Sequence, residues 1–265
     1  MKVVIFGVSG RMGKELLQAA SRLRGQGQDI EVLAGMVAEG DPALGHTVSD
    51  VRFPLAQSWQ ESFDEADMLI DFSAPEGAMA ALAVASTRGI PLVECTTGLS
   101  EAEEKQVALA ATKTPIVRAR NTSIGVSVLA QLVRRATALL GPDYEVELVE
   151  LHHRHKRDAP SGTAYHLLEE VAAARGESLS DSITLGRRGV GPERRKAEIG
   201  AQAVRGGDVA GEHTVYFFGE GERLELTHRA TSRRIFADGA FRAARWLAQG
   251  RKPGLYSMLD VLEQA

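Results

Sequence analysis

The hydrophobic pattern changes character near the middle of the chain. In the first 120 residues, short runs that are apolar throughout, such as 3–6 and 68–70, alternate with segments whose apolar residues recur at helical spacing, such as 14–23. Runs without polar positions are typical of parallel strands buried between two layers of helices. The first part of the chain therefore predicts a Rossmann-like, doubly wound α/β domain with a parallel sheet.

The expected elements of this domain follow one another in alternation. Strands are predicted at residues 3–6, 31–37, 68–73, 90–94 and 115–118, and helices at 14–23, 75–89 and 100–112. The last of these helices begins with a capping box, in which Ser100 and Glu103 bond to each other's backbone.

Beyond residue 121 the strands have another pattern. Residues 144–153 alternate polar and apolar side chains, the period of a strand with one exposed face, so we place a domain boundary near Asn121. Similar strands are predicted at 214–218 and 223–228, and helices at 124–140, 160–175, 235–249 and 255–263. The Gly- and Arg-rich segment 186–211 predicts a solvated loop, with a subunit contact or a cover over the substrate as the alternative.

Composition narrows the function classes. The 265 residues carry 31 Lys and Arg against 35 Asp and Glu, a net charge of −4, whereas general nucleic-acid binding usually needs a basic excess. The single cysteine, Cys95, excludes a disulfide framework and a multi-cysteine metal site. No signal-peptide pattern and no apolar run long enough to span a bilayer is evident, so we expect a soluble, cytoplasmic protein.

Three glycines follow the first strand and open the first helix. Gly7 suits a tight turn, Gly10 lets a pyrophosphate approach the backbone, and Gly13 lets the helix pack on the strand. The spacing departs from the usual G-x-G-x-x-G, but the strand–turn–helix context favours dinucleotide binding over an ordinary turn. Loops at 72–73, 95–98 and 119–122 fall at the same strand ends, so we expect them to converge on one ligand.

The densest chemistry lies at residues 150–164, which combine three histidines, basic side chains and the predicted start of a helix. One interpretation is a solvated basic loop. A second is a metal site of His152, His153 and His155, which the adjacent Lys156 opposes by repelling a cation. The third, which we favour, is an anionic-substrate site with a histidine acid, because the N–H groups at the helix start attract carboxylates.

With these residues in view, the sequence resembles the 4-hydroxy-tetrahydrodipicolinate reductase family, also called dihydrodipicolinate reductases. The segments that carry the resemblance run along nearly the whole chain, and the histidine–lysine segment is the most specific of them. They are residues 7–13, 70–73, 96–98, 121–125, 152–156 with 158–164, and 205–208 with 211–213.

The resemblance implies a fold and an activity. It implies a dinucleotide-binding domain of residues 1–123 and 234–265, and a smaller α+β mixed-sheet domain of residues 124–233 that binds substrate and forms a homotetramer. The implied reaction is hydride transfer from NADPH or NADH to a small, cyclic, anionic dicarboxylate, with loss of water, in lysine and diaminopimelate biosynthesis.

The resemblance also implies roles for particular residues. His152 would be the proton donor and Lys156 the second catalytic residue, while His153, Gly162 and Thr163 would bind the substrate carboxylates. No metal is implied. The dinucleotide would lie against Gly7, Val8, Ser9, Gly10, Arg11, Met12, Cys95, Thr96, Thr97, Ala119, Arg120, Asn121 and Thr122.

The residues at the end of the second strand predict which of the two cofactors is preferred, because an acid at that place usually binds the hydroxyls of the adenosine ribose. Val37 and Ala38 occupy that place, Glu39 comes late, and Arg11 lies beside the helix start. We therefore expect both cofactors to bind, with NADPH favoured and affinities within about tenfold, or ~1.4 kcal/mol.

Two rival functions remain open from the sequence. Another nicotinamide-dependent amino-acid or imino-acid dehydrogenase would explain the first half of the chain but not the histidine–lysine segment. A non-catalytic dinucleotide sensor would need neither His152 nor Lys156. Turnover of the dicarboxylate substrate distinguishes the three possibilities.

Overall fold

A computed structural model describes residues 1–48, 51–54 and 63–263 of the chain. The chain forms two compact units, Met1–Ile124 with Arg233–Ala265, and Gly125–Ser232. These boundaries lie one residue from the ones expected from the sequence.

The first unit contains an eight-stranded sheet in the order β13-β7-β6-β5-β1-β2-β4-β3. Neighbouring strands pair in parallel except β3 and β4, which are antiparallel. The strands are β1 (Lys2–Phe6), β2 (Glu31–Met36), β3 (Thr47–Val48), β4 (Val51–Arg52), β5 (Met68–Asp71), β6 (Leu92–Glu94), β7 (Pro115–Arg118) and β13 (Gly254–Tyr256).

Helices cover both faces of this sheet, as the all-apolar strands predict. Val3 and Ile5 of β1 belong to a core that includes residues of α1, α7 and α8, whereas Val4 and Phe6 belong to a second core with residues of α2 and α3. The predicted doubly wound α/β class and the Ser100–Glu103 capping box are both confirmed. The helices are α1 (Arg11–Gly25), α2 (Pro75–Arg88), α3 (Glu101–Ala111), α7 (Arg234–Leu247) and α8 (Met258–Glu263).

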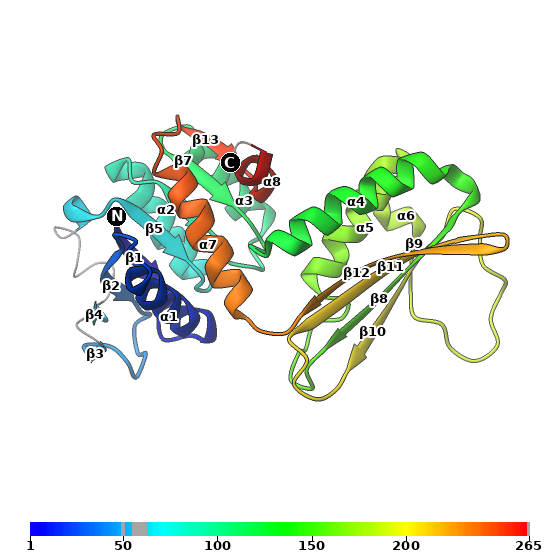
Figure 1. Ribbon diagram of the computed structural model, residues 1–265, viewed down its shortest axis with the longest axis horizontal. Coiled ribbons are helices and arrows are strands. Elements are labelled where there is room, and N and C mark those ends of the chain that lie inside the picture. The colour runs from blue at the N-terminus through cyan, green and yellow to red at the C-terminus, as the bar shows by residue number, and fades with distance from the viewer. Residues whose placement is uncertain (49–50, 55–62, 264–265) are drawn as a thin grey trace. The chain divides into compact units, whose positions relative to one another are not determined.

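The second unit is a mixed five-stranded sheet in the order β12-β11-β8-β10-β9. Alternate residues of the central strand β8, including Val146 and Leu148, join a core with helices α4 and α5, which lie on one face of the sheet (Figure 1). The elements are α4 (Ile124–Leu140), a 3₁₀ turn (Gly141–Asp143), β8 (Glu145–His152), α5 (Gly162–Arg175), α6 (Leu179–Ser182), β9 (Ile183–Leu185), β10 (Ile199–Arg205), β11 (Gly211–Gly219) and β12 (Glu222–Ala230).

Two sequence expectations about these elements are wrong. Residues 255–263 are not one helix, because Gly254–Tyr256 pairs with β7 as strand β13 and only Met258–Glu263 is helical. The segment 186–211 is not simply a loop, because it contains β10, which lies between β8 and β9. In both places backbone pairing with a strand distant in sequence decides the conformation, and local periodicity carries no signal of such pairing.

A third expectation, that no apolar segment could span a bilayer, also needs correction. Residues Ile124–Asp143 are long and apolar enough to cross a membrane by length and composition. Leu129, Ala130 and Val133 of α4 nevertheless pack into the core of the second unit. Packing on its own sheet therefore explains these residues, whereas Val128, Leu132 and Leu139 of the same helix are exposed.

The helix α7 returns to the first unit and packs against the chain just before the second. A Cβ atom on Gly239 would lie 1.9 Å from the Thr122 carbonyl oxygen, and Thr122 Oγ1 donates to the Phe236 carbonyl at 2.7 Å. Because a backbone oxygen cannot rotate away, Gly239→Ala should lower the free energy of unfolding by about 1–3 kcal/mol.

Gly25→Ala at the end of α1 is the matched control, since nothing lies within 4 Å of its added Cβ. It should leave stability unchanged or raise it by up to about 1 kcal/mol. Denaturant unfolding of both variants measures this, and equal stabilities would show that α7 is not packed against Thr122.

Candidate active site

The turn after β1 is built for close approach of the backbone. Gly7 has φ +76°, and a Cβ there would lie 2.5 Å from the Phe72 carbonyl oxygen. A Cβ on Gly13 would lie 2.3 Å from the Val8 carbonyl oxygen, so Gly13 lets α1 pack on this turn. Gly10 is the N-cap of α1. The backbone N–H groups of the helix start are therefore available at the end of β1, the arrangement that binds phosphates.

A pocket of about 430 Å³ opens at the carboxyl ends of β1, β2 and β5. Three of the predicted dinucleotide residues line it, namely Gly7, Ser9 and Gly10. The remaining lining residues are Phe6, Met36, Val37, Ala38, Glu39, Asp41, Phe72, Ser73, Ala74, Glu76, Gly77 and Ala80. A pocket in this position is where doubly wound sheets bind dinucleotides.

An acidic residue, Asp41, lines this pocket a few residues after the end of β2. Ser9 Oγ donates to Asp41 Oδ2 at 2.6 Å, and the Ala43 amide donates to Oδ1 at 2.8 Å. These hydrogen bonds lower the pKa of Asp41, so it is an anion at neutral pH. The sequence analysis missed Asp41 because it considered only the positions directly after β2, whereas the chain turns back toward Ser9 several residues later.

The other predicted dinucleotide residues do not line this pocket: Val8, Arg11 and Met12 belong to the turn after β1 and the start of α1, and the rest lie at the ends of β6 and β7. Ser73 N donates to Thr96 Oγ1 at 3.1 Å, and Arg118 Nη1 donates to the Thr96 carbonyl at 2.8 Å, so the loops after β5 and β6 meet. The Cys95 side chain lies in the core, where burial raises its pKa well above its usual range. The Cys95 side chain therefore belongs to the core of the first unit.

The predicted side chains that could reach a dinucleotide differ in exposure. Thr97 and Arg120 are exposed, as is Arg11 at the start of α1. Thr122 is buried, and Asn121 Oδ1 accepts from the Ser123 amide at 2.8 Å, so these two side chains help to shape the loop after β7. Val8 and Ala119 are buried, while Met12 packs against the core.

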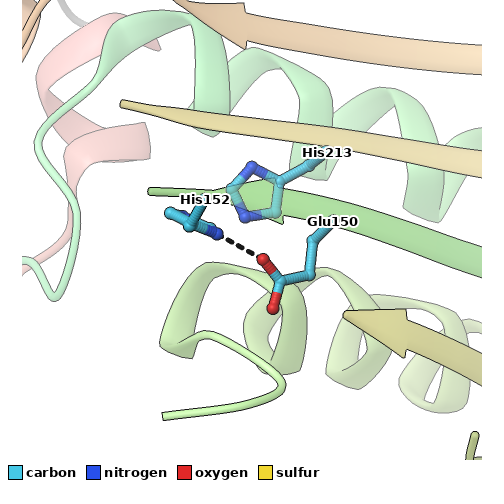
Figure 2. A group of neighbouring side chains, drawn as sticks. All are labelled: Glu150, His152 and His213. Carbon is cyan, nitrogen blue, oxygen red and sulfur yellow. Dashed lines mark hydrogen bonds and ion pairs between the residues drawn. The ribbon is translucent and has the colours of Figure 1, made fainter. Parts of the chain in front are cut away.

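In the second unit, the candidate proton donor lies at the end of β8. His152 Nδ1 is hydrogen-bonded to Glu150 Oε2, and both side chains are buried (Figure 2). The two residues share one face of the strand because they are two positions apart. Arg205 of β10 donates to both oxygens of Glu150, at 2.7 and 3.0 Å, and the Ser161 amide donates to Oε1 at 3.2 Å.

These partners decide the charge of Glu150. Burial opposes its ionisation, but hydrogen bonds from His152 and Arg205 outweigh burial and lower the pKa of Glu150 to about 2. A carboxylate at Nδ1 leaves the other ring nitrogen, Nε2, to exchange a proton with a ligand. A Cβ on Gly211 would lie 2.9 Å from that Nε2, so the neighbouring backbone comes close to the ring.

His213 of β11 completes the buried group. Its ring lies edge-on to the ring of His152, with the centroids 5.1 Å apart (Figure 2). Its Nε2 is 3.0 Å from Ser161 Oγ. Burial lowers the pKa of His213 to about 3, with a contribution from His152. His213 is therefore neutral at physiological pH.

Ligand atoms of Glu150, His152 and His213 lie within 4.8 Å of one another, close enough to hold a metal ion. This is not the trio of neighbouring histidines weighed from the sequence. Arg205 contacts both oxygens of Glu150, and its guanidinium would repel a cation there. We interpret the group as a hydrogen-bonded network.

The remaining predicted residues lie between β8 and α5. Lys156 Nζ is 2.9 Å from Asp158 Oδ2, and the Lys156 amide donates to the His153 carbonyl at 3.1 Å. Helix α5 begins at Gly162, with Thr163 next, and its N-cap is Ser161, whose Oγ accepts from Ala164 N at 3.2 Å. The predicted substrate residues thus belong to one loop and the start of one helix.

Sequence inspection missed Glu150, Arg205 and His213. Glu150 carried a usable signal, since a residue two positions before His152 on a strand shares its face. Arg205 and His213 come from other strands, and only sheet pairing places Arg205 opposite His152.

Comparison with known proteins identifies the family. The chain matches "Dihydrodipicolinate reductase, N-terminus" over residues 1–122 and "Dihydrodipicolinate reductase, C-terminus" over residues 125–262. The chain belongs to the dihydrodipicolinate reductase family. The expected family is thereby confirmed, and with it an oxidoreductase that uses NADH or NADPH.

Individual relatives match nearly the whole chain. It is 43% identical to the 4-hydroxy-tetrahydrodipicolinate reductase of Anaeromyxobacter dehalogenans (strain 2CP-C), covering 98% of this chain and 97% of the relative. It is 44% identical to the enzyme of that name from Rubrobacter xylanophilus, covering 100% and 99%. The solved dipicolinate-bound dihydrodipicolinate reductase from Paenisporosarcina sp. TG-14 has a TM-score of 0.75, 22% identity and 97% coverage of both chains, which supports the fold.

The burial of His213 predicts how the stability of the protein changes at acidic pH. Between pH 3 and 6.5 the unfolded chain binds a proton at His213 that the folded chain does not, so stability should fall on acidification through this window. His213→Gln should make that fall shallower, by up to about 1.4 kcal/mol per pH unit. Denaturant unfolding at pH 4, 5, 6 and 7 measures the slope.

The matched control is His155→Gln, because His155 is exposed. This variant should keep the wild-type slope. Parallel slopes for His213→Gln and wild type would contradict a neutral, buried His213.

Proposed function

We propose that this chain is a 4-hydroxy-tetrahydrodipicolinate reductase that works in lysine and diaminopimelate biosynthesis. It would transfer a hydride from NADH or NADPH to a cyclic, unsaturated dicarboxylate, with loss of a hydroxyl as water, to give tetrahydrodipicolinate. Relatives with this name support the proposal by their identity over nearly the whole chain. The observation that carries it is the buried Glu150–His152 pair beside Lys156 and the start of α5.

The first unit fits a dinucleotide by its backbone. The Gly7–Gly10 turn, where an added Cβ would strike neighbouring backbone at Gly7, leads into α1 and borders a pocket at the sheet edge. A bound nicotinamide would supply the hydride. The turn residues Gly7 to Met12, with residues 95–97 and 119–122 at the neighbouring strand ends, would hold and orient the cofactor.

The second unit fits a dianionic substrate. The start of α5 at Gly162 and Thr163 carries the partial positive charge of a helix N-terminus, and His153 and Lys156 belong to the loop before it. These groups would bind the two carboxylates. Local positive charge also explains how an acidic protein attracts a dianion.

His152 would donate the proton that the reduction requires. Hydride addition to a conjugated imine leaves negative charge that a positioned acid must neutralise. Glu150 holds Nδ1 of the ring, so the proton given to the substrate would leave from Nε2. Lys156 would be the second catalytic residue, and its ammonium would stabilise the charge that develops.

The rival functions explain less. Another amino-acid or imino-acid dehydrogenase would share the first unit but gives no reason for the relatives' match over residues 125–262. A dinucleotide sensor would not need a buried carboxylate–histidine pair. An assay that mixes the protein with the dicarboxylate substrate and monitors the loss of NADH or NADPH absorbance distinguishes the reductase from both rival functions.

We expect His152→Gln to lower kcat by about 10²-fold or more, because a general acid typically contributes that much. Lys156→Met should also lower kcat. Steady-state kinetics measure both, and dinucleotide affinity, measured by titration of the free enzyme, should stay within about twofold for each variant. A near-normal kcat for His152→Gln would remove His152 from the mechanism.

The structure changes our expectation about cofactor preference. The described residues that line the pocket include Glu39, Asp41 and Glu76 but no lysine or arginine. An ionised carboxylate accepts hydrogen bonds from ribose hydroxyls and repels a 2′-phosphate. We therefore propose that NADH, not NADPH, is the favoured cofactor, and that Asp41 is the residue that discriminates.

Asp41→Asn tests this proposal, because it removes the charge and keeps an acceptor for Ser9. The ratio of the NADPH to the NADH dissociation constant should fall by about tenfold, or ~1.4 kcal/mol. Fluorescence titration of each cofactor measures it, and Glu15→Gln on α1 serves as a control outside the pocket lining. An unchanged ratio, or tighter NADPH than NADH binding in the wild type, would refute the role of Asp41.

We also propose a homotetramer in the cytoplasm. Helices α4 and α5 of the second unit cover one face of its sheet (Figure 1). The exposed Val204 of β10, and Tyr216 stacked on Phe218 of β11 at 5.7 Å, supply apolar and aromatic surface on these strands. Such a surface suits contact with further copies of the chain.

The substrate partner is a small molecule, with no role proposed for nucleic acid or membrane.

A further inference from the structure

Two carboxyl groups lie side by side where β5 and β6 end. Asp71 is the last residue of β5 and Glu94 the last residue of β6, and the two are direct partners in the parallel pairing. Both side chains have no exposed surface. Two adjacent buried carboxylates would repel each other without screening by water, so this arrangement requires a further explanation.

The hydrogen bonds differ sharply between the two groups. Asp71 accepts at both oxygens, from the Ser73 amide at Oδ1 (3.1 Å) and from Thr96 Oγ1 at Oδ2 (2.5 Å). Glu94 Oε1 accepts from the Thr96 amide at 2.8 Å. Glu94 Oε2 is buried, and no donor among the described residues reaches it.

An oxygen that lacks a donor, next to a carboxylate, is the place where a proton satisfies both groups. A hydroxyl at Oε2 can donate to Asp71, whereas Asp71 already uses both oxygens as acceptors. We propose that Glu94 is a neutral carboxylic acid with its proton at Oε2, and that the Glu94–Asp71 pair is the support that positions the two loops after β5 and β6.

The charges around the pair agree with this assignment. Burial and the neighbouring Asp71 together raise the pKa of Glu94 to about 9, against the opposing effects of the Thr96 amide and Arg118. Burial also raises the pKa of Asp71, but hydrogen bonds with Glu94, Ser73 and Thr96 oppose that rise. Arg118 Nη1 is 3.8 Å from Glu94 Oε1, but its strongest partner is Glu104 at 2.7 Å. Among the described residues, the buried Cys95 thiol also faces the pair, and burial raises its pKa well above its usual range, so the thiol is neutral.

Through this pair, one proton links two loops of the proposed dinucleotide site. Asp71 holds the Ser73 amide and the Thr96 hydroxyl, and Glu94 holds the Thr96 amide. The Thr96 hydroxyl also accepts from the Ser73 amide at 3.1 Å, which closes the network. Asp71 and Glu94 are positioning residues, since their buried side chains hold the loops from within. This consequence for the cofactor rests on the proposed function, whereas the location of the proton does not.

The first test compares Glu94→Gln with wild type as the pH rises. The glutamine amide imitates the neutral acid, since its oxygen can accept from Thr96 and its NH₂ can donate to Asp71. A glutamate with a folded pKa near 9 and an unfolded pKa near 4.5 contributes stability below pH 4.5 that is lost progressively up to pH 9. Glutamine does not titrate, so the variant does not lose stability at this position as the pH rises.

We therefore expect Glu94→Gln to match the wild-type Tm at pH 5 and to exceed it by about 5 °C or more at pH 8.5. Glu101→Gln, an exposed position on α3, should show a Tm difference from wild type that does not change with pH. A Tm difference for Glu94→Gln that is constant from pH 5 to 8.5, or a lower Tm at pH 8.5, would overturn the neutral acid.

The second test is NADH binding at pH 7. Glu94→Gln should keep the dissociation constant within about twofold, whereas Asp71→Asn, which leaves one acceptor oxygen for two loop donors, should raise it about tenfold or more. Wild-type affinity in Asp71→Asn would overturn the positioning role. Failure of wild-type protein to bind NADH would refute the dinucleotide function and the positioning role together, and the Tm comparison would still decide where the proton lies.

Discussion

Carboxyl groups buried at strand ends organise the functional edge of both units. Strand ends expose backbone groups and begin irregular loops, which have few hydrogen bonds of their own. In the second unit, Glu150 binds His152, Arg205 and the amide of Ser161. In the first unit, Asp71 and Glu94 bind the loops that follow their strands. These buried carboxyl groups thus hold loops that are distant in sequence in one fixed arrangement.

The number of donors decides the charge of each group. Glu150 receives hydrogen bonds from a guanidinium, an imidazole and an amide, and these compensate the loss of water, so its pKa is about 2. Glu94 is buried, faces another carboxyl and accepts one amide hydrogen bond from the described residues, so its pKa is about 9. The same residue type is therefore an anion in one unit and a neutral acid in the other, and the cause is the local supply of donors.

This difference matches the tasks that we propose for the two units. A permanent anion beside His152 suits a histidine that acts as a proton donor, because the carboxylate binds Nδ1 and fixes the orientation of the ring. A neutral acid beneath the dinucleotide loops suits a site that binds a polyanion, because a further buried negative charge there would oppose binding. At the end of β2, the ionised Asp41 would have the opposite use in our proposal, since it would repel a 2′-phosphate and so discriminate between the cofactors.

The sequence by itself determined the class of fold, the family and most of the local chemistry. All-apolar strands predict a sheet covered on both faces, and the Ser100–Glu103 box predicts where α3 begins, because these signals depend on residues near one another in the chain. The histidine–lysine segment pointed to the family for the same reason, since its residues are contiguous.

Only the tertiary structure decided which distant residues meet. Arg205 reaches Glu150 because β10 pairs with β8, and Gly254–Tyr256 forms a strand because the edge of β7 accepts it. Asp41 reaches Ser9 through a turn of the chain, and Glu94 loses its charge because it is buried beside Asp71 of the neighbouring strand. Each of these outcomes depends on contacts between segments far apart in sequence, and local patterns of hydrophobic and polar residues do not encode such pairings.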